Sequence, residues 1–334
     1  MRWFVGILLF VLIAGCQSFD YYTQAIGGHL KMMARARPVS DWIADPATPP
    51  ELKQRLETAR RIREFASKSL KLPDNNSYLT YADLDRSYVV WNVFAAPEFS
   101  VEPKKECFPF TGCVSYRGFY SEDDARRHAV RLREQGYDVY VGGVPAYSTL
   151  GWFDDPLLST FIRYSDAQLA RLVFHELAHQ LVYARDDTTF NESFAVTVEQ
   201  EGVKRWLESE KRAGELAGFH AAQARQRELA ERVSQARERL AGVYRMDLAR
   251  EAMLEHKRGE WDRLRASYPA LPAEPNNAFL LSIAVYTELV PAFERLLAES
   301  GDLEDFYRRV KKLAAAKQPE RDAYFRKEGY PRPS

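Results

Sequence analysis

The sequence predicts an α+β fold, in which a small mixed sheet precedes a predominantly helical region. Residues 87–96, 113–120 and 137–144 are rich in β-branched and aromatic side chains, as strands are. A helical pattern at residues 121–135 separates the last two of these segments. From residue 202 to about residue 268, long runs of Ala, Arg, Glu, Leu and Gln with few breakers predict antiparallel helices.

Helical spacing and proline positions define the remaining elements. Apolar spacing predicts one helix that ends at Pro38 and a second that starts at Pro50. After a break at residues 272–277, a further helix is interrupted at Pro291. Within the long helical region, alternating steps of four and three residues predict a packed seam made of Leu229, Val233, Ala236, Leu240 and Val243.

Length and charge set the broad class of the protein. The 334 residues suffice for one large domain or two smaller ones, and a hydrophobic content of 46% predicts a substantial core. Lys plus Arg equals Asp plus Glu at 47 each, so we expect no nucleic-acid partner. We expect a signal segment at residues 1–15, the N-terminal helices, sheet and site at residues 16–202, and a helical region that covers the cleft at residues 203–334.

The N-terminus has the shape of a secretory signal. Arg2 is followed by an apolar run at residues 3–13 and by small residues before Cys16. This run is shorter than the roughly 20 apolar residues of a membrane-spanning helix. Its end, "LIAGC", resembles the lipobox of bacterial lipoproteins, which implies export, a membrane anchor through lipid on Cys16, and, with Gln17 next, the outer membrane facing the periplasm. The alternatives are an ordinary signal peptide or an uncleaved anchor.

The other two cysteines, Cys107 and Cys113, form an even pair, which suits an oxidising compartment. They bracket "FPFTG", a turn-prone stretch that could bring their Cα atoms within disulfide reach. A metal-binding thiol pair is the rival interpretation, but it lacks a second CxxC or a nearby His. We therefore predict a disulfide.

The stretch "VFHELAHQLV", residues 173–182, carries two histidines four residues apart. Upstream, Ser165 and Gln168 form a capping-box pattern that predicts a helix here. On a helix, His175 and His179 share one face, so both imidazoles can meet one zinc ion. Glu176 is then a candidate general base for a zinc-activated water. The alternative is an amphipathic helix that carries histidines without a metal.

A catalytic zinc also needs a third protein ligand and an open fourth position. Glu192, in "DDTTFNESFAVTVEQEG", can supply this ligand from a second helix, which predicts one zinc ion (Zn2+) per chain. The alternative is that Thr189 and Glu192 form another capping box.

The motifs resemble a known family. "HELAH" followed by "NESFAVTVEQEG" is similar to the gluzincin metallopeptidases, especially zinc aminopeptidases of the alanyl-aminopeptidase type. The matching residues are Asn191, Glu192, Phe194, Ala195, Val198 and Glu199. Together with the lipobox, "GCVSYRGFY", "AYSTLGWFDDP" and "NNAFLLSIAVY", the chain resembles the bacterial putative aminopeptidase family. The resemblance implies a zincin-like core, peptide substrates, His175, His179 and Glu192 as zinc ligands, and Glu176 as the base.

The chain departs from the large aminopeptidases in two ways. Its segment from His179 to Glu192 is shorter, and their G-A-M-E-N strand, which holds the substrate's amino terminus, is absent. We expect residues 146–156 to form a strand and turn that could pair with a peptide. Candidates for binding the free amine are Asp154, Asp155 and Glu199. Candidates for stabilising the oxyanion are Tyr244 and Tyr286. A plain turn explains the two Asp equally well.

These observations predict a zinc metallopeptidase, most specifically an aminopeptidase that hydrolyses N-terminal peptide bonds with Glu176 as general base. One alternative is an endopeptidase that acts on envelope proteins. Another is a non-catalytic lipoprotein scaffold with a vestigial or structural zinc site.

Overall fold

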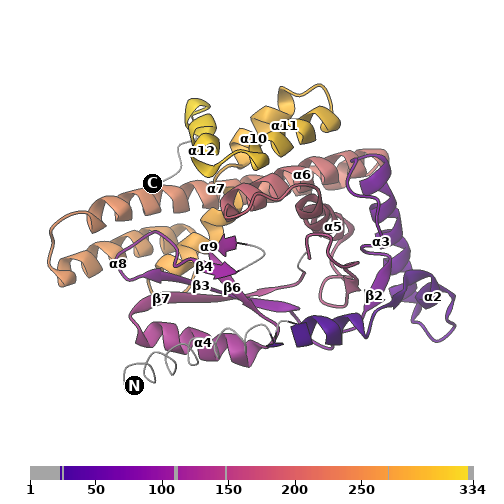
Figure 1. Cartoon of the computed structure of the whole chain (residues 1–334), viewed down its shortest axis with the longest axis horizontal. Coiled ribbons are helices and arrows are strands. Elements are labelled where there is room, and N and C mark those ends of the chain that lie inside the picture. The colour runs from indigo at the N-terminus through magenta and orange to yellow at the C-terminus, as the bar shows by residue number, and fades with distance from the viewer. Residues whose placement is uncertain (1–22, 25, 109–111, 147–148, 270, 330–334) are drawn as a thin grey trace, which may run out of the picture.

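The computed structural model describes residues 23–24, 26–108, 112–146, 149–269 and 271–329. The predicted signal segment and Cys16 lie outside the described residues. Helices predominate and the sheets are small, which confirms the α+β prediction (Figure 1). Among the described residues, no helix combines the length and the apolar content needed to cross a bilayer.

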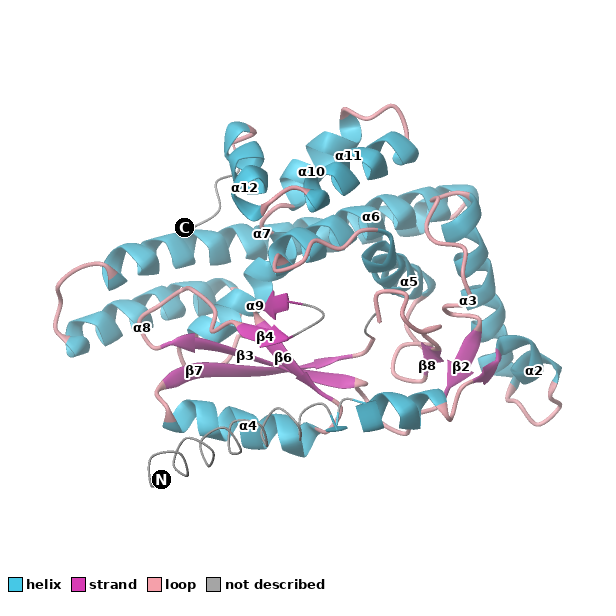
Figure 2. Cartoon of the chain, viewed as in Figure 1, coloured by secondary structure: helices cyan, strands magenta, loops and turns pink. Residues whose placement is uncertain are grey.

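An antiparallel sheet of three strands, which we call the main sheet, has the order β6 (Tyr116–Phe119), β3 (Val90–Pro97) and β7 (Tyr137–Val144). Helix α4 (Glu122–Glu134) packs on one face of this sheet, and α9 (Asn277–Thr287) packs on the other (Figure 2). Strand β7 coincides with its predicted segment. The side chains buried between sheet and α4 are Trp91, Val93, Ala95, Phe119, Ala125, Ala129, Leu132 and Val139.

A second sheet joins three short strands: β1 (Arg37–Pro38), β2 (Thr80–Ala82) and β8 (Leu157–Leu158). Strand β1 pairs antiparallel with β2, and β2 pairs parallel with β8. A strand and turn were expected at residues 146–156: the turn is present at residues 150–153, but residues 149–156 contain no strand before β8 begins. The helix predicted to end at Pro38 ends at Met33, because Pro38 pairs with β2 instead.

The predicted disulfide is present. It joins Cys107 and Cys113 across the hairpin of β4 (Glu106–Phe108) and β5 (Gly112–Val114), with the Cα atoms 3.9 Å apart. The backbone N–H of Cys113 donates a 2.5 Å hydrogen bond to the Asp186 carboxylate. The hairpin is therefore tied to the loop between α5 and α6.

The helices α5 (Asp166–Leu181) and α6 (Thr188–Ser209) pack against each other, α3 (Pro50–Lys68) packs on both, and α2 (Val39–Ala44) packs on α3 at the edge of the molecule (Figure 1). Helix α3 begins at Pro50, as predicted. A Cβ atom at Gly202 would lie 2.7 Å from the Phe174 ring and 2.8 Å from Leu70. Gly202 therefore allows the helices to approach closely, and this approach fixes how α5 and α6 face each other.

Helices α7 (Ala213–Tyr244) and α8 (Arg250–Ser267) form a long antiparallel hairpin beside the main sheet (Figure 1). The predicted seam is confirmed at its centre. Val233, Ala236 and Leu240 are buried, and together with Trp261, Leu264, Leu271 and Leu280 they form one apolar cluster.

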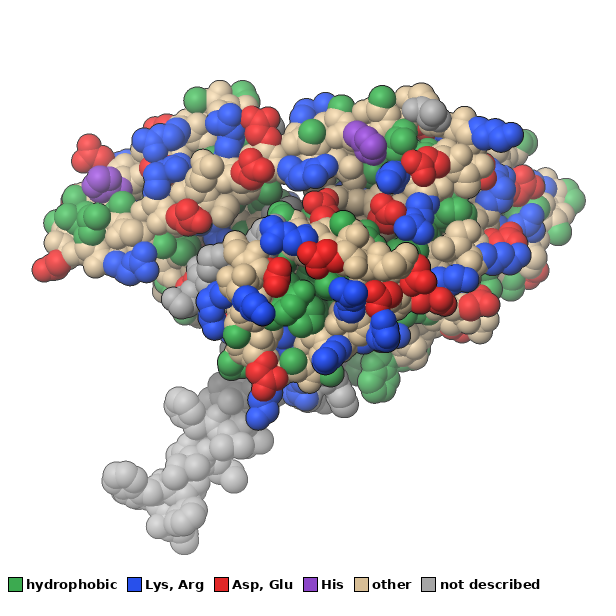
Figure 3. Space-filling view, turned by 90° about the horizontal axis from the view of Figure 1, so that it is seen from above, with side chains coloured by type: hydrophobic (Ala, Val, Ile, Leu, Met, Phe, Trp, Pro, Cys, Tyr) green, Lys and Arg blue, Asp and Glu red, His purple; other side chains and the backbone are tan. Residues whose placement is uncertain are grey.

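The last helices, α10 (Val290–Ala298), α11 (Leu303–Ala315) and α12 (Gln318–Lys327), lie above α6 in Figure 1. Pro291 stands in the first turn of α10, where it costs no helical hydrogen bond. The rings buried between α6 and these helices are Phe190, Phe194, Phe293, Phe306 and Phe325. Residue 202, where a domain division was expected, lies inside α6. Acidic and basic side chains are interspersed over this face (Figure 3).

Candidate metal centre

Helix α5 holds the two histidines of the first motif. Its N-terminus is capped by Ser165, whose hydroxyl accepts from the Gln168 backbone N–H. One face of the helix is fully buried in the largest apolar cluster of the described residues. The residues on this face include Leu169, Val173, Phe174, Leu177 and Ala178. On the other face, the Nε2 atoms of His175 and His179 lie 3.1 Å apart. The helix therefore presents two imidazole nitrogens to one point, as predicted.

The loop between α5 and α6 is fixed at both ends. The Asn191 side chain accepts from the Ala184 backbone N–H at 2.7 Å and donates to the Ala184 carbonyl at 2.8 Å. Asp187 caps α6 by accepting from the Phe190 backbone N–H, and its other oxygen pairs with buried Arg321 at 2.9 Å. The Asn of the second motif thus closes the short loop and sets the start of the helix that carries Glu192.

Glu192 completes a cluster with the two imidazoles. Its Oε2 atom lies 3.3 Å from Nε2 of His175 and 3.6 Å from Nε2 of His179. Ligand atoms placed tetrahedrally at about 2.0 to 2.1 Å from one zinc are about 3.3 to 3.4 Å apart. The three separations in the cluster, 3.1, 3.3 and 3.6 Å, lie within about 0.3 Å of the edges of such a tetrahedron, so this donor set fits a metal ion such as zinc.

Glu199, a candidate for binding the substrate amine, lies against His175. It is 5% exposed, and its Oε2 atom lies 2.9 Å from Nδ1 of His175, while Arg171 lies 3.6 Å from its Oε1 atom. Because both oxygens contact the protein, the carboxylate serves to orient the His175 ring. The sequence carried a signal for this contact, since Glu199 follows Glu192 by two helical turns on the same face of α6.

Burial and mutual contact shift the pKa values of the cluster. Burial lowers the pKa of His175, but hydrogen bonds to Glu192 and Glu199 outweigh it and raise this pKa to about 10. Burial raises the pKa of Glu192, but the neighbouring charge of His179 and contacts with His175 lower it overall. For Glu176, which is 8% exposed, burial dominates and raises the pKa to about 7. A carboxyl with this pKa can accept and release a proton near neutral pH.

Asp154 and Asp155, the other expected amine-binding residues, belong to a turn. The buried carboxylate of Asp155 accepts from the Thr149 backbone N–H at 3.0 Å and from the Gln180 amide at 3.1 Å. Asp154 accepts from the Asn76 amide at 3.3 Å. The turn reading is therefore favoured for both residues, and Asp155 fastens this turn to the end of α5.

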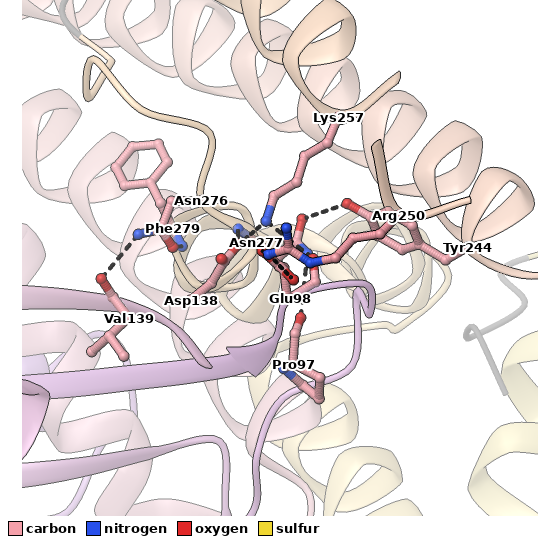
Figure 4. Close-up of polar contacts among 10 residues, drawn as sticks. All are labelled: Pro97, Glu98, Asp138, Val139, Tyr244, Arg250, Lys257, Asn276, Asn277 and Phe279. Carbon is pink, nitrogen blue, oxygen red and sulfur yellow. Dashed lines mark hydrogen bonds and ion pairs between the residues drawn. The ribbon is translucent and has the colours of Figure 1, made fainter. Parts of the chain in front are cut away.

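Tyr244 lies elsewhere in the fold. Its hydroxyl donates to the Asn277 side chain at 3.2 Å, among polar contacts between the main sheet and the α7–α8 hairpin (Figure 4). Its expected role in stabilising an oxyanion stays a prediction. The side chain of Tyr286 lies outside the described residues. The sequence analysis missed Tyr183, directly after α5: burial, followed by the charge of Glu192, raises its pKa to about 12.

Two helices with facing imidazoles and a carboxylate define a candidate metal centre. The chain belongs to the family described as "Putative aminopeptidase", whose model matches residues 20–325. No curated protein and no solved structure matches the chain. Membership in this family indicates a peptidase, and so a hydrolase, and the match includes the described elements from β1 to α11 and most of α12.

Proposed function

We propose that this protein is a zinc-dependent aminopeptidase that hydrolyses the N-terminal peptide bonds of short peptides. The observation that carries the proposal is the convergence of His175, His179 and Glu192, with donor atoms at the spacing that one zinc requires. The family membership and the resemblance of the motifs to the gluzincins support the same reaction.

Charge balance supports a cation at this site. Glu176, Glu192 and Glu199 are all at least nine-tenths buried, whereas the basic side chain that pairs with Glu199, Arg171, is 41% exposed. Buried carboxylates require a compensating positive charge. Zinc held by His175, His179 and Glu192 would supply this charge, act as a Lewis acid, and lower the pKa of a coordinated water to about 7.

The remaining steps fall to the side chains of the chain itself. Glu176 accepts the proton of the attacking water and returns it to the nitrogen of the departing amine. Glu199 accepts from Nδ1 of His175 and so keeps Nε2 of that ring free to act as a ligand. Tyr183, which stays protonated at neutral pH, donates to the developing oxyanion.

The lipobox-like N-terminus and the disulfide support a proposed location in the cell envelope. Lipid on Cys16 anchors the chain to the outer membrane, with the enzyme facing the periplasm. The Cys107–Cys113 bond suits such an oxidising compartment. Its substrates are then peptides of the cell envelope.

The function is tested by Glu176→Gln, which should retain one zinc per chain but lower turnover by about 10² to 10⁴-fold. Metal content and peptide hydrolysis are measured together, with free and N-acetylated peptides of the same sequence. An aminopeptidase cleaves only the free peptides. Glu201→Gln is the matched control, since Glu201 lies on α6 and pairs with Arg205 at 2.7 Å. Full turnover by Glu176→Gln would contradict the mechanism.

The role of Tyr183 is tested by Tyr183→Phe, which should lower kcat by about 10²-fold because one oxyanion donor is lost. Zinc content should stay at the wild-type level. Tyr164→Phe, which removes a half-buried hydroxyl before α5, is the control. An unchanged kcat would exclude Tyr183 as the donor.

A further inference from the structure

Four large apolar side chains are unusually exposed in one part of the surface, which we call the apolar patch. These residues are Ile26 (58% exposed), Leu30 (58%), Trp152 (74%) and Phe153 (52%). Single exposed apolar residues are ordinary on soluble proteins, but contiguous ones mark a surface that contacts something else.

Two segments that are far apart in the sequence form the patch. The buried ring of His29, in the N-terminal helical residues 26–33, packs against the Phe153 ring in a tilted arrangement with centroids 4.4 Å apart. On that helix, Ile26 and Leu30 are four residues apart and point outward, while His29 and Met32 point inward. This ring contact places the N-terminal helix beside the turn that carries Trp152 and Phe153.

The exposure of the two aromatic residues is fixed by the backbone. The N–H of Trp152 donates to the Thr149 carbonyl at 3.1 Å, and the N–H of Phe153 donates to the Thr149 hydroxyl at 3.1 Å. Buried Asp155 then secures the turn to Gln180 at 3.1 Å. The turn is therefore held in a geometry that presents Trp152 and Phe153 to the outside.

The composition and place of the patch fit a lipid surface. Aromatic side chains, Trp above all, favour the membrane interface, and adjacent Lys and Arg favour anionic headgroups. Lys31 and Arg35 are exposed and follow the patch on the same chain segment. The chain between Cys16 and Thr23 can span at most about 25 Å when fully extended. A lipid on Cys16 would therefore hold the patch next to the bilayer.

We propose that the apolar patch docks on the bilayer surface and is a second membrane contact beside the lipid anchor. The inference rests on the anchor proposed above. The turn that carries Trp152 contacts α5 at Gln180, directly after the ligand His179. Docking therefore orients the metal centre at a fixed height above the membrane, so that peptides reach it along the envelope surface.

The test uses the full-length lipoprotein, reconstituted in vesicles of phosphatidylethanolamine and phosphatidylglycerol that contain brominated acyl chains. Bromine quenches Trp fluorescence only at close range, and the lipoprotein that begins at Cys16 has five Trp residues, because Trp3 belongs to the signal segment. We expect quenching in the wild type that is lost in Trp152→Phe. Trp261→Phe is the matched control, because Trp261 is 2% exposed in the helical hairpin, and it should leave the quenching unchanged.

Three outcomes would overturn the proposal, and they differ in what they say about the anchor. If the wild type does not sediment with vesicles, both anchor and docking fail. If it sediments but Trp152→Phe is quenched as strongly as the wild type, the anchor stands and docking fails. If quenching is equal and Trp152→Ala raises the KM for peptides, the patch binds substrate instead of lipid.

Discussion

Two buried polar clusters in this molecule differ in how their charges are balanced. Between the main sheet and the α7–α8 hairpin, Lys257 donates to Asp138 at 2.6 Å and to the Glu98 carbonyl at 3.0 Å, and the Asn277 backbone N–H donates to Asp138 at 2.6 Å (Figure 4). The Lys257 and Asp138 side chains are 5% and 14% exposed. One cation meets one anion, and both are hydrogen-bonded.

The cluster between α5 and α6 is balanced differently. It gathers the carboxylates of Glu176, Glu192 and Glu199 around two imidazoles, and Nδ1 of buried His179 has no partner among the described residues. In the absence of a metal, hydrogen bonds to Glu192 and Glu199 raise the pKa of His175, and the protonated ring supplies a positive charge.

The difference separates a structural cluster from a functional one. The Asp138–Lys257 cluster is complete within the chain and fastens the hairpin to the sheet. The His175 cluster has an excess of buried negative charge and unused donor atoms, which a divalent cation would satisfy. Variants of the first cluster should therefore change stability, and variants of the second should change metal binding.

The largest effect is expected from Lys257→Met. It leaves Asp138 buried without its cation, so the free energy of unfolding should fall by about 3 to 5 kcal/mol in urea denaturation. Arg250→Met is the control in the same cluster, because its partner Glu98 is part-exposed and Arg250 is 59% exposed, and it should cost less than about 1 kcal/mol. An equal loss of unfolding free energy in the two variants would contradict the structural role of the buried Lys257–Asp138 pair.

A smaller effect is expected from Glu199→Gln. Loss of the carboxylate that orients His175 should weaken zinc binding by about 10 to 100-fold, measured by competition with a chelator. Glu201→Gln, two residues further along α6, should bind zinc like the wild type. Unchanged affinity in Glu199→Gln would show that the 2.9 Å contact with Nδ1 of His175 does not position the ring.

The smallest effect is a pH dependence of zinc affinity. A zinc ligand must be a neutral imidazole, and the pKa of His175 in the metal-free chain is raised to about 10. Protonation of His175 stabilises the metal-free fold. This contribution is complete at pH values below the ordinary histidine pKa of about 6.5, and it is lost as the pH rises through 10. Apparent zinc affinity should therefore rise by up to about tenfold per pH unit between about pH 6 and pH 8. A zinc affinity that does not change with pH would contradict the protonation of His175 in the metal-free chain.

Local patterns predicted much of the fold and of the metal centre. Strand β7, the start of α3, the capped helix α5 and the disulfide follow from spacing, caps and turn residues close together in the sequence. Helical periodicity predicted that His175 and His179 share one face of α5, and the motif resemblance predicted that Glu192 joins them from α6.

Contacts between distant segments were harder to predict. Residues 149–156 have the composition of a strand, but the Asp155 carboxylate bonds to the Thr149 backbone and holds the segment in a turn. Tyr244 was chosen from its sequence position alone, yet the α7–α8 hairpin carries it to Asn277. Glu199 was identified by motif, but its contact with His175 depends on how closely α5 and α6 pack.

The central claim is that His175, His179 and Glu192 hold one zinc ion, and zinc X-ray absorption on the zinc-loaded full-length chain tests it most directly. The spectrum should show two imidazole nitrogens and carboxylate oxygen at about 2.0 to 2.2 Å from the metal, with one zinc per chain. A chain that takes up no zinc, or a spectrum with only water oxygens around the metal, would contradict the claim.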